Sequence, residues 1–139
     1  MNFTHLHVHT EYSLLDGSNK IKEYVDRVKE LGMDSAAITD HGVMYGVIDF
    51  YRAARAAGIN PILGCEVYVA PGSRFDRETG SGEDRYYHLV LLAENNQGYS
   101  NLMKIVSKGF VEGFYYKPRV DLQLLEKYHE GIIALSACL

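Results

Sequence analysis

A regular alternation of strand-like and helix-like segments constrains this chain more than any other feature. Short apolar runs typical of buried strands separate segments whose apolar residues recur at helical spacing. The pattern predicts strands at 3–9, 35–39, 61–69, 89–93 and 131–136, and helices at 19–31, 46–57, 98–111 and 120–129. Residues 71–85 are rich in glycine, serine and charge, so we expect an exposed loop there. Strands that alternate with helices pair in parallel through right-handed crossovers, and an α/β fold is therefore predicted.

The length of the chain limits how much of such a fold it contains. The 139 residues end directly after the fifth predicted strand, with no helix to cover it. A closed parallel barrel needs about eight strand–helix units and typically ~250 residues. We therefore expect part of a barrel, with an open edge strand that favours self-association.

Composition excludes several classes of protein. The net charge of −4 has the wrong sign for a domain that grips DNA through its own basic surface, so nucleic acid would be met through metal ions or a partner region. No apolar run approaches the ~20 residues of a membrane span, and the N-terminus lacks a secretory signal. We expect a cytoplasmic protein with no membrane partner. Two cysteines are too few for a disulfide framework.

His7 and His9 form the first candidate metal-binding motif. Residues two apart on a strand share a face, and neutral imidazole suits zinc, manganese or iron. Taken alone, the pair is more often two unrelated side chains than a metal site. His5 shares their face but lies roughly 6.6 Å deeper along the strand. Because active groups gather at the carboxyl ends of parallel strands, we expect His5 to pack beneath the site, in the core or behind the ligands.

Further candidates accompany the later strands. Asp16 lies in the first loop, where Asp-Gly is ordinarily a turn, and His41 follows the second strand. Glu66 interrupts an apolar strand, where a carboxylate is costly unless it is paired or bound to a cation. Alternation sends Cys65 to the opposite face, toward the helices, as an inert buried thiol.

Four positions leave alternatives open. His88 opens the fourth strand instead of closing it, which the argument from strand ends does not explain. Cys138 closes the fifth strand, and a metal ligand and a structural thiol are equally supported. Asp40 is either a cap or a group that orients a ligand histidine. Arg119 is more simply a residue of an ordinary surface loop than a side chain that clamps a phosphate group. The tyrosines are more simply core or interface residues than stacking platforms for bases.

Taken together, one candidate ligand or more accompanies each strand–helix step. This periodicity is what a metal cluster at one mouth of a barrel requires. Closely spaced divalent cations hold a phosphate group, stabilise the leaving oxygen and generate hydroxide from water.

Several segments resemble a known family. Residues 3–17, 37–42 and 61–66 are similar to the first three motifs of the PHP (polymerase and histidinol phosphatase) domain of bacterial DNA polymerase III alpha subunits, and 88–95, 101–107 and 135–139 also look like that branch. The resemblance covers essentially the whole chain. Stand-alone PHP phosphatases carry histidines where this chain has Asp16 and Cys138, which again favours the polymerase branch.

The resemblance implies a fold and a ligand set. The fold would be α/β, a PHP-type distorted (β/α)7 barrel truncated here to about five strands. Residues 1–139 would be the N-terminal part of the PHP domain, with the remainder of the barrel and the polymerase domains absent. The implied ligands are His7, His9, Asp16, His41, Glu66, His88 and Cys138. All of them except Cys138 would also act in catalysis, through the ions that they hold. Up to three divalent ions are implied (zinc, manganese or iron, with magnesium also suitable), and two later ligands, an Asp and a His, lie beyond the chain.

The implied function is a 3′–5′ exonuclease that proofreads DNA within a DNA-directed DNA polymerase. Its partners would be the DNA 3′ end, the other polymerase domains and replisome subunits. Two alternatives belong to other classes: a non-catalytic module whose metals staple the fold, and a small-molecule phosphatase of the histidinol phosphate type. For the 139-residue chain alone we expect partial metal occupancy and little activity.

Overall fold

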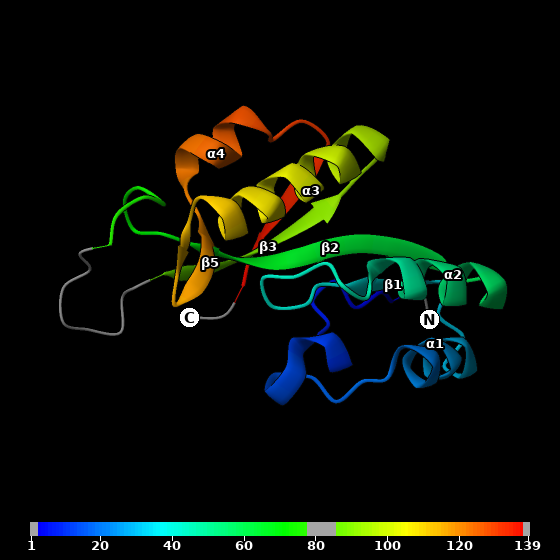
Figure 1. The fold of residues 1–139 in the computed structure, drawn as a ribbon. Helices are drawn as coiled ribbons and strands as arrows, with labels where there is room; N and C mark the ends of the chain where they lie inside the picture. The colour runs from blue at the N-terminus through cyan, green and yellow to red at the C-terminus, as the bar shows by residue number, and fades with distance from the viewer. Residues whose placement is uncertain (1–2, 78–85, 138–139) are drawn as a thin grey trace.

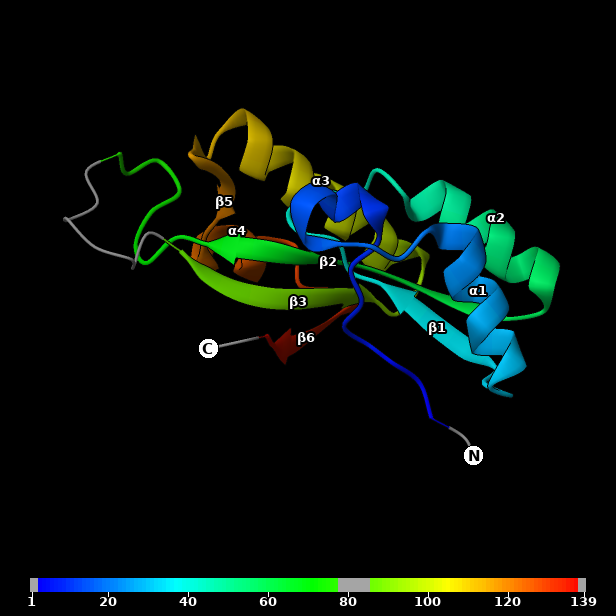
Figure 2. The same cartoon turned by 90° about the horizontal axis from the view of Figure 1, so that it is seen from below.

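A computed structural model describes residues 3–77 and 86–137, which form one sheet with helices packed against it (Figures 1 and 2). The helices are η1 (a 3-10 helix, Glu11–Asp16), α1 (Ile21–Glu30), α2 (Val47–Ala57), α3 (Asn96–Val111) and α4 (Leu122–Lys127). The strands are β1 (Ser35–Ile38), β2 (Asn60–Val69), β3 (Tyr87–Ala93), β4 (Phe114–Tyr115), β5 (Lys117–Val120) and β6 (Ile132–Ser136). The strand order is β4-β5-β2-β3-β6, with β1 also paired to β2. The long strand β2 therefore organises the sheet.

The strand directions differ from the all-parallel expectation. Strand β2 pairs in parallel with β1 and β5, but β3 runs antiparallel to both β2 and β6. Parallel neighbours need a crossover, usually a helix. The described part of the connection from β2 to β3, residues 70–77 and 86, contains no helix, and β3 folds back along β2. The prediction of parallel pairing throughout is wrong for this strand, while the α/β class is confirmed.

Two apolar cores hold the helices to the sheet. One lies between α1, α2 and β1, around Val25, Ile38 and Phe50. The other lies between α3 and the central strands, around Leu91 and Leu102, and it includes Cys65. Cys65 is fully buried there, and burial raises the pKa of its thiol. The prediction that this cysteine faces the helices is confirmed.

Helix ends agree with the sequence signals. Gly58 adopts a left-handed conformation (φ +77°) directly after α2, where the chain must turn out of the helix. Gly32 does the same (φ +69°) shortly after α1. The predicted boundaries of all four helices are accurate to within two residues, including those of α4, which was expected at 120–129 and covers 122–127.

Three predictions about segments are wrong. Residues 3–9 are extended but form no strand, although the Val8 N–H donates to Thr39 Oγ1 and the Thr39 N–H donates to the Val8 carbonyl, each at 2.8 Å. Residues 117–119, where an ordinary surface loop was expected, belong to strand β5. Arg74, in a segment expected to be exposed, is buried. Its guanidinium pairs with the Asp121 and Glu112 carboxylates, which offset the cost of burying the charge.

No helix among the described residues is both long enough and apolar enough to cross a bilayer.

Strand β6 pairs only with β3 among the described strands, and Ile133 on it is exposed. The self-association expected of an open edge stays a prediction.

Candidate metal centre

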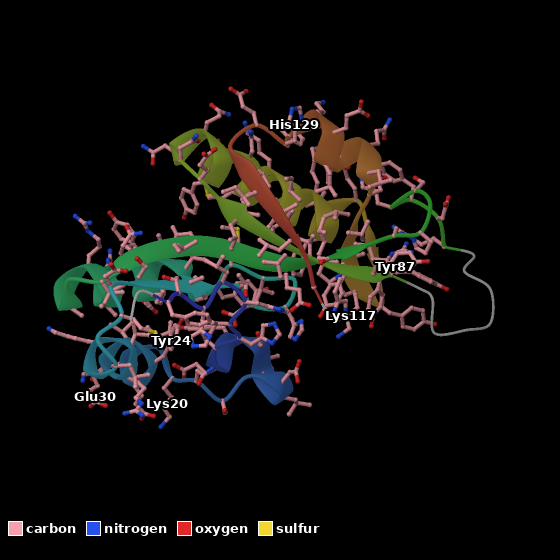
Figure 3. The ribbon with its side chains drawn as sticks, turned by 180° about the vertical axis from the view of Figure 1, so that it is seen from behind. Lys20, Tyr24, Glu30, Tyr87, Lys117 and His129 are labelled. Carbon is pink, nitrogen blue, oxygen red and sulfur yellow. The ribbon has the colours of Figure 1, made fainter. Side chains whose placement is uncertain are left out.

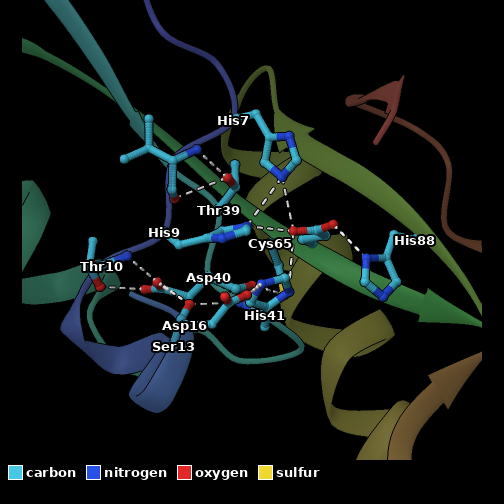
Figure 4. A network of polar contacts seen from close by, with 12 residues as sticks. His7, His9, Thr10, Ser13, Asp16, Thr39, Asp40, His41, Cys65 and His88 are labelled. Atoms are coloured by element: carbon cyan, nitrogen blue, oxygen red, sulfur yellow. Dashed lines mark hydrogen bonds and ion pairs between the residues drawn. The ribbon is translucent and has the colours of Figure 1, made fainter. Parts of the chain in front are cut away.

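A single buried carboxylate lies at the centre of the candidate site. Glu66 is wholly inaccessible to solvent on β2, and four imidazoles converge on it (Figure 4). His7 and His9 come from the N-terminal segment, His41 from the loop after β1 and His88 from the start of β3. Segments far apart in the sequence thus meet at one end of the sheet.

The donor atoms of these side chains are closely spaced. Glu66 Oε2 lies 2.9 Å from His7 Nε2, 2.5 Å from His9 Nε2 and 3.2 Å from His41 Nδ1. The other oxygen, Oε1, lies 2.9 Å from His88 Nδ1. The two Nε2 atoms of His7 and His9 are themselves only 3.2 Å apart. One carboxylate therefore bridges all four rings.

Asp16 extends the cluster toward solvent. It ends the 3-10 helix η1, and its Oδ2 lies 2.5 Å from His41 Nε2. The Asp16 side chain is 71% exposed, whereas that of His41 is only 14% exposed. The carboxylate thus forms the outer rim of the site, above a histidine that links it to Glu66.

The reversed direction of β3 explains the position of His88. In the register of β2 and β3, His88 lies opposite Tyr68, two residues beyond Glu66. Because β3 runs antiparallel to β2, its first residues lie where β2 ends. His88 therefore joins the same rim from the beginning of its strand, which the argument from parallel strands could not explain.

Charge and burial act together on these groups. Burial, the largest single effect on Glu66, opposes ionisation, but the hydrogen bonds with His9 and His7 and the charges of His41 and His7 outweigh it, and they lower the pKa of Glu66 to about 2. The hydrogen bond with Glu66 raises the pKa of His9. Burial and the neighbouring His9 lower the pKa of His41. Glu66 is thus a permanent negative charge beneath the four rings.

Asp40 holds the loop that carries the site. It is buried at the end of β1, where its Oδ1 accepts hydrogen bonds from the Thr10 N–H (2.6 Å) and the Ser13 hydroxyl (2.7 Å), and its Oδ2 accepts one from the Thr10 hydroxyl (2.7 Å). Ser13 Oγ also accepts from the His41 N–H at 3.1 Å. No hydrogen bond joins the Asp40 carboxylate to a histidine ring among the described residues. Asp40 therefore positions the segments that carry His9 and His41 through Thr10 and Ser13.

Thr10 and Ser13 were missed by the sequence analysis. A signal was present, because a buried aspartate at a strand end needs several donors, and two hydroxyl residues closely follow the His-x-His motif.

We expect Asp40→Asn to lower the metal affinity of the site by about 10–100-fold, the usual effect of losing a group that orients ligands. The neutral amide would place an N–H₂ donor where Oδ2 accepts from the Thr10 hydroxyl, and it would remove the charge that strengthens the bonds from Thr10 and Ser13. Metal content after dialysis against graded chelator would measure the change. Asp34→Asn, at an exposed position before β1, is the matched control, and equal metal content in the two variants would contradict the assignment.

His5 and Arg119 are not among the side chains that contact Glu66 in the described residues. His5 is exposed and packs edge-on against Phe3, with ring centroids 4.8 Å apart, so the alternative that placed it in the core is wrong. It lines a pocket together with His7 and His9, and its place behind the ligands stays a prediction. Arg119 is fully buried and donates to the carbonyls of Gly113, Arg74 and Asp76, so the expected surface loop is also wrong. These contacts give it a structural role away from the carboxylate cluster. Cys138 lies outside the described residues.

The donor set fits divalent metal ions. Within the described part of the chain, three groups of possible ligands overlap: His7, His9 and Glu66; His9, Asp16 and His41; and His41, Glu66 and His88. Within each group the donor atoms lie within 4.8 Å of one another. Bonds of about 2.0–2.1 Å in a tetrahedral zinc site place donor atoms about 3.3 Å apart, close to the 3.2 Å between His7 Nε2 and His9 Nε2 and between His41 Nδ1 and Glu66 Oε2. His41 Nδ1 is buried and makes no well-formed hydrogen bond, which leaves a ring nitrogen suited to a cation.

Fold and site together define an α/β domain with a candidate divalent-metal centre at one end of its sheet. The model of the PHP domain family matches residues 5–139. The chain belongs to the PHP domain family.

Two relatives show which branch of the PHP domain family this chain is similar to. The chain is 53% identical over 139 residues to DNA polymerase III subunit alpha of Treponema pallidum, covering all of this chain and 12% of that protein. It is 51% identical over 143 residues to the same subunit of Aquifex aeolicus, covering 99% of this chain and 12% of the relative. The chain therefore spans about an eighth of the length of these relatives.

Solved structures share the fold. A candidate metal-dependent phosphoesterase from Bifidobacterium adolescentis superposes with a TM-score of 0.51 at 22% identity, covering 77% of this chain and 34% of that one. An amidohydrolase from Chromobacterium violaceum, solved with bound sulfate and no metal, gives a TM-score of 0.50 at 26% identity, covering 76% and 34%. The architecture is thus that of PHP-like phosphoesterases, consistent with a truncated, distorted barrel.

Proposed function

We propose that this chain is the N-terminal part, residues 1–139, of the PHP domain of a replicative DNA polymerase III alpha subunit, and that the domain is a metal-dependent 3′–5′ exonuclease. The observation that carries the proposal is the convergence of His7, His9, His41 and His88 on buried Glu66, with Asp16 at the rim. The similarity to alpha subunits along the whole chain supports the polymerase context. That context implies a cytoplasmic location and the other polymerase domains and replisome subunits as partners.

Each residue has a defined role in this proposal. The imidazoles of His7, His9, His41 and His88 hold the cations through ring nitrogens, and Asp16 and Glu66 supply the negative charge that favours them. Three overlapping donor groups suit up to three ions: zinc, manganese or iron, with magnesium also suitable. When bound, divalent ions neutralise phosphate oxygens and supply hydroxide near neutral pH. Cys138 remains the proposed seventh ligand.

The net charge of the chain is consistent with a site that meets DNA through its cations. At −4, the chain itself repels DNA, so the phosphodiester would be held through the cations and through the rest of the polymerase.

The test uses a full-length alpha subunit that contains this chain, with its metal content measured first. Single-stranded DNA and a primer with a mismatched 3′ end are the substrates, and nucleotide addition is assayed in parallel. We expect His9→Ala to lower the rate of 3′-end hydrolysis by more than 100-fold while nucleotide addition persists, because His9 belongs to two of the three donor groups. His129→Ala, at an exposed histidine after α4, is the matched control.

Two results would redirect the assignment. A metal-loaded subunit that is inert on both DNA substrates, but loses stability when His9 is replaced, would indicate the structural module. The wide sequence separation of the donors favours this second candidate, because an ion held between them joins distant segments. Turnover of a phosphomonoester far above that of DNA would instead indicate a small-molecule phosphatase.

A further inference from the structure

A groove of about 440 Å³ opens directly beside the candidate metal centre. Asp16, His41 and His88 form its inner end, and its walls include Tyr12, Leu14, Leu15, Tyr45, Tyr68 and Tyr86. Its volume lies in the range of sites that take small organic ligands. The groove is also lined by one lysine, Lys117 of β5. Figure 3 shows Lys117 at the end of the sheet that lies away from Glu30 of α1.

The aromatic surface of the groove is continuous with the candidate ligands. The Tyr86 ring stacks on the His88 ring, with centroids 5.7 Å apart and planes 6° apart. The Tyr68 ring lies 6.3 Å from the His41 ring, with planes 14° apart, and meets Tyr86 edge-on at 4.8 Å. Flat π-surfaces therefore lead outward from the metal centre.

Three further wall residues face solvent. Tyr45 is 67% exposed, and Leu14 and Leu15 are more exposed still. Leu14 is held with φ +54°, ψ −112° in η1, directly before Leu15 and Asp16. Non-glycine residues persist in such strained conformations where the surroundings require them, most often at functional sites. Exposed apolar and aromatic groups beside a reactive centre are suited to a ligand with a flat, weakly polar part.

Lys117 supplies the polar counterpart. Its Nζ lies 5.5 Å from the centroid of the Tyr68 ring, and its side chain is exposed. A cation beside stacked aromatic rings, next to a site for phosphoryl chemistry, matches a nucleotide: a base for the rings and an anionic phosphate for the ammonium group.

We propose that the groove binds the 3′-terminal nucleotides of single-stranded DNA, with the terminal base stacked between Tyr45 and Tyr86 and a neighbouring phosphate paired with Lys117. This inference rests on the proposed exonuclease function and names the substrate-binding surface of that same site. Stacking on tyrosine tolerates every base, which suits an enzyme that removes any terminal nucleotide. It also requires an unpaired end, because a base within a duplex presents no free face.

The test compares two oligonucleotides with the full-length subunit, one ending in a normal nucleotide and one ending in an abasic residue. We expect Tyr45→Ala and Tyr86→Ala to lower kcat/KM about ten-fold on the normal end and to leave the abasic end nearly unchanged. The Phe variants should restore the normal rate, since they keep the ring. Tyr51→Ala, at an exposed tyrosine of α2, is the control outside the groove. Equal loss on both ends, or no loss on either, would overturn the stacking assignment.

Lys117→Ala provides an independent measurement. Loss of one phosphate contact should weaken hydrolysis of both oligonucleotides equally and reduce the slope of log kcat/KM against log salt concentration by about one. An unchanged salt slope would overturn the assignment of Lys117.

Binding without hydrolysis separates this inference from the proposed function. A trinucleotide with 2-aminopurine at its 3′ end should be quenched by the wild-type subunit and about ten-fold more weakly bound by Tyr45→Ala and Tyr86→Ala. If DNA is not cleaved but this quenching is seen, the exonuclease proposal fails and the groove stands. If DNA is cleaved but the probe is unaffected by either variant, the groove assignment fails alone.

Discussion

Glu66→Gln should lower the metal affinity of the centre by more than 100-fold. Glu66 belongs to two of the three overlapping donor groups, and its two oxygens lie within 3.2 Å of nitrogens from four histidines. Replacing groups that merely orient ligands costs 10–100-fold, and the loss of a charged donor shared by two groups should exceed that. The amide keeps the shape of the side chain but removes its charge, so the effect reports on electrostatics and not on packing.

The measurement is metal content after dialysis against graded chelator, followed by hydrolysis of a 3′-labelled oligonucleotide by the full-length subunit. Glu94→Gln makes the same chemical change at an exposed position after β3 and serves as the control. If Glu66→Gln kept the metal content of the wild type, Glu66 would not be a ligand, and the four histidines would need another explanation.

Asp121→Ala should destabilise the region around α4 by about 3–5 kcal/mol, as expected when one partner of a buried ion pair is removed. Asp121 is almost fully buried, and its carboxylate lies 3.0 Å from Arg74 Nη1. It also accepts from the Arg74 N–H and caps α4 by accepting from the Leu124 N–H, each at 2.9 Å. Burial opposes ionisation of Asp121, but these contacts prevail and lower its pKa. Among the described residues, the substitution leaves the buried Arg74 charge with Glu112 as its one remaining ion-pair partner.

Hydrogen exchange in the full-length subunit would measure this loss, because it reports local opening free energies without unfolding the other domains. Peptides from α4 and from residues 71–77 should exchange faster, while α1 should be unaffected. Asp26→Ala, which removes an exposed pair with Lys22 on α1, should change local stability by less than about 1 kcal/mol. Similar effects from the two substitutions would show that the Arg74–Asp121 pair is no stronger than a surface pair.

Periodicity predicted the helices well because their cores are local. The apolar faces of α1 and α2 lie in one cluster with β1, and glycine conformations end both helices where the sequence indicated. The predicted direction of β3 was wrong, because the direction of a strand depends on how distant segments pair. The absence of a helical pattern before β3 indicated a connection without a crossover, and that signal would have given β3 its antiparallel direction.

The sequence predicted which residues form the candidate site better than it predicted how those residues are arranged. Six of the proposed ligands do meet in space, but only the structure shows that Glu66 lies at their centre and that β3 must run backward for His88 to reach it. Arg119 was misread because a charged residue between a proline and a valine resembles a surface loop. Its burial depends on carbonyl acceptors from 74, 76 and 113, which no local pattern reveals.

Glu66 draws together positions 7 and 88, which are far apart in the unfolded chain. In the proposed loaded state, the cations would bind the native chain and find no matching site in the unfolded one, so mass action would favour folding. At a free metal concentration 100-fold above the dissociation constant, this linkage amounts to about 2.7 kcal/mol. Cellular metal supply would then govern how much of the subunit is correctly folded, in addition to the rate of the proposed hydrolysis.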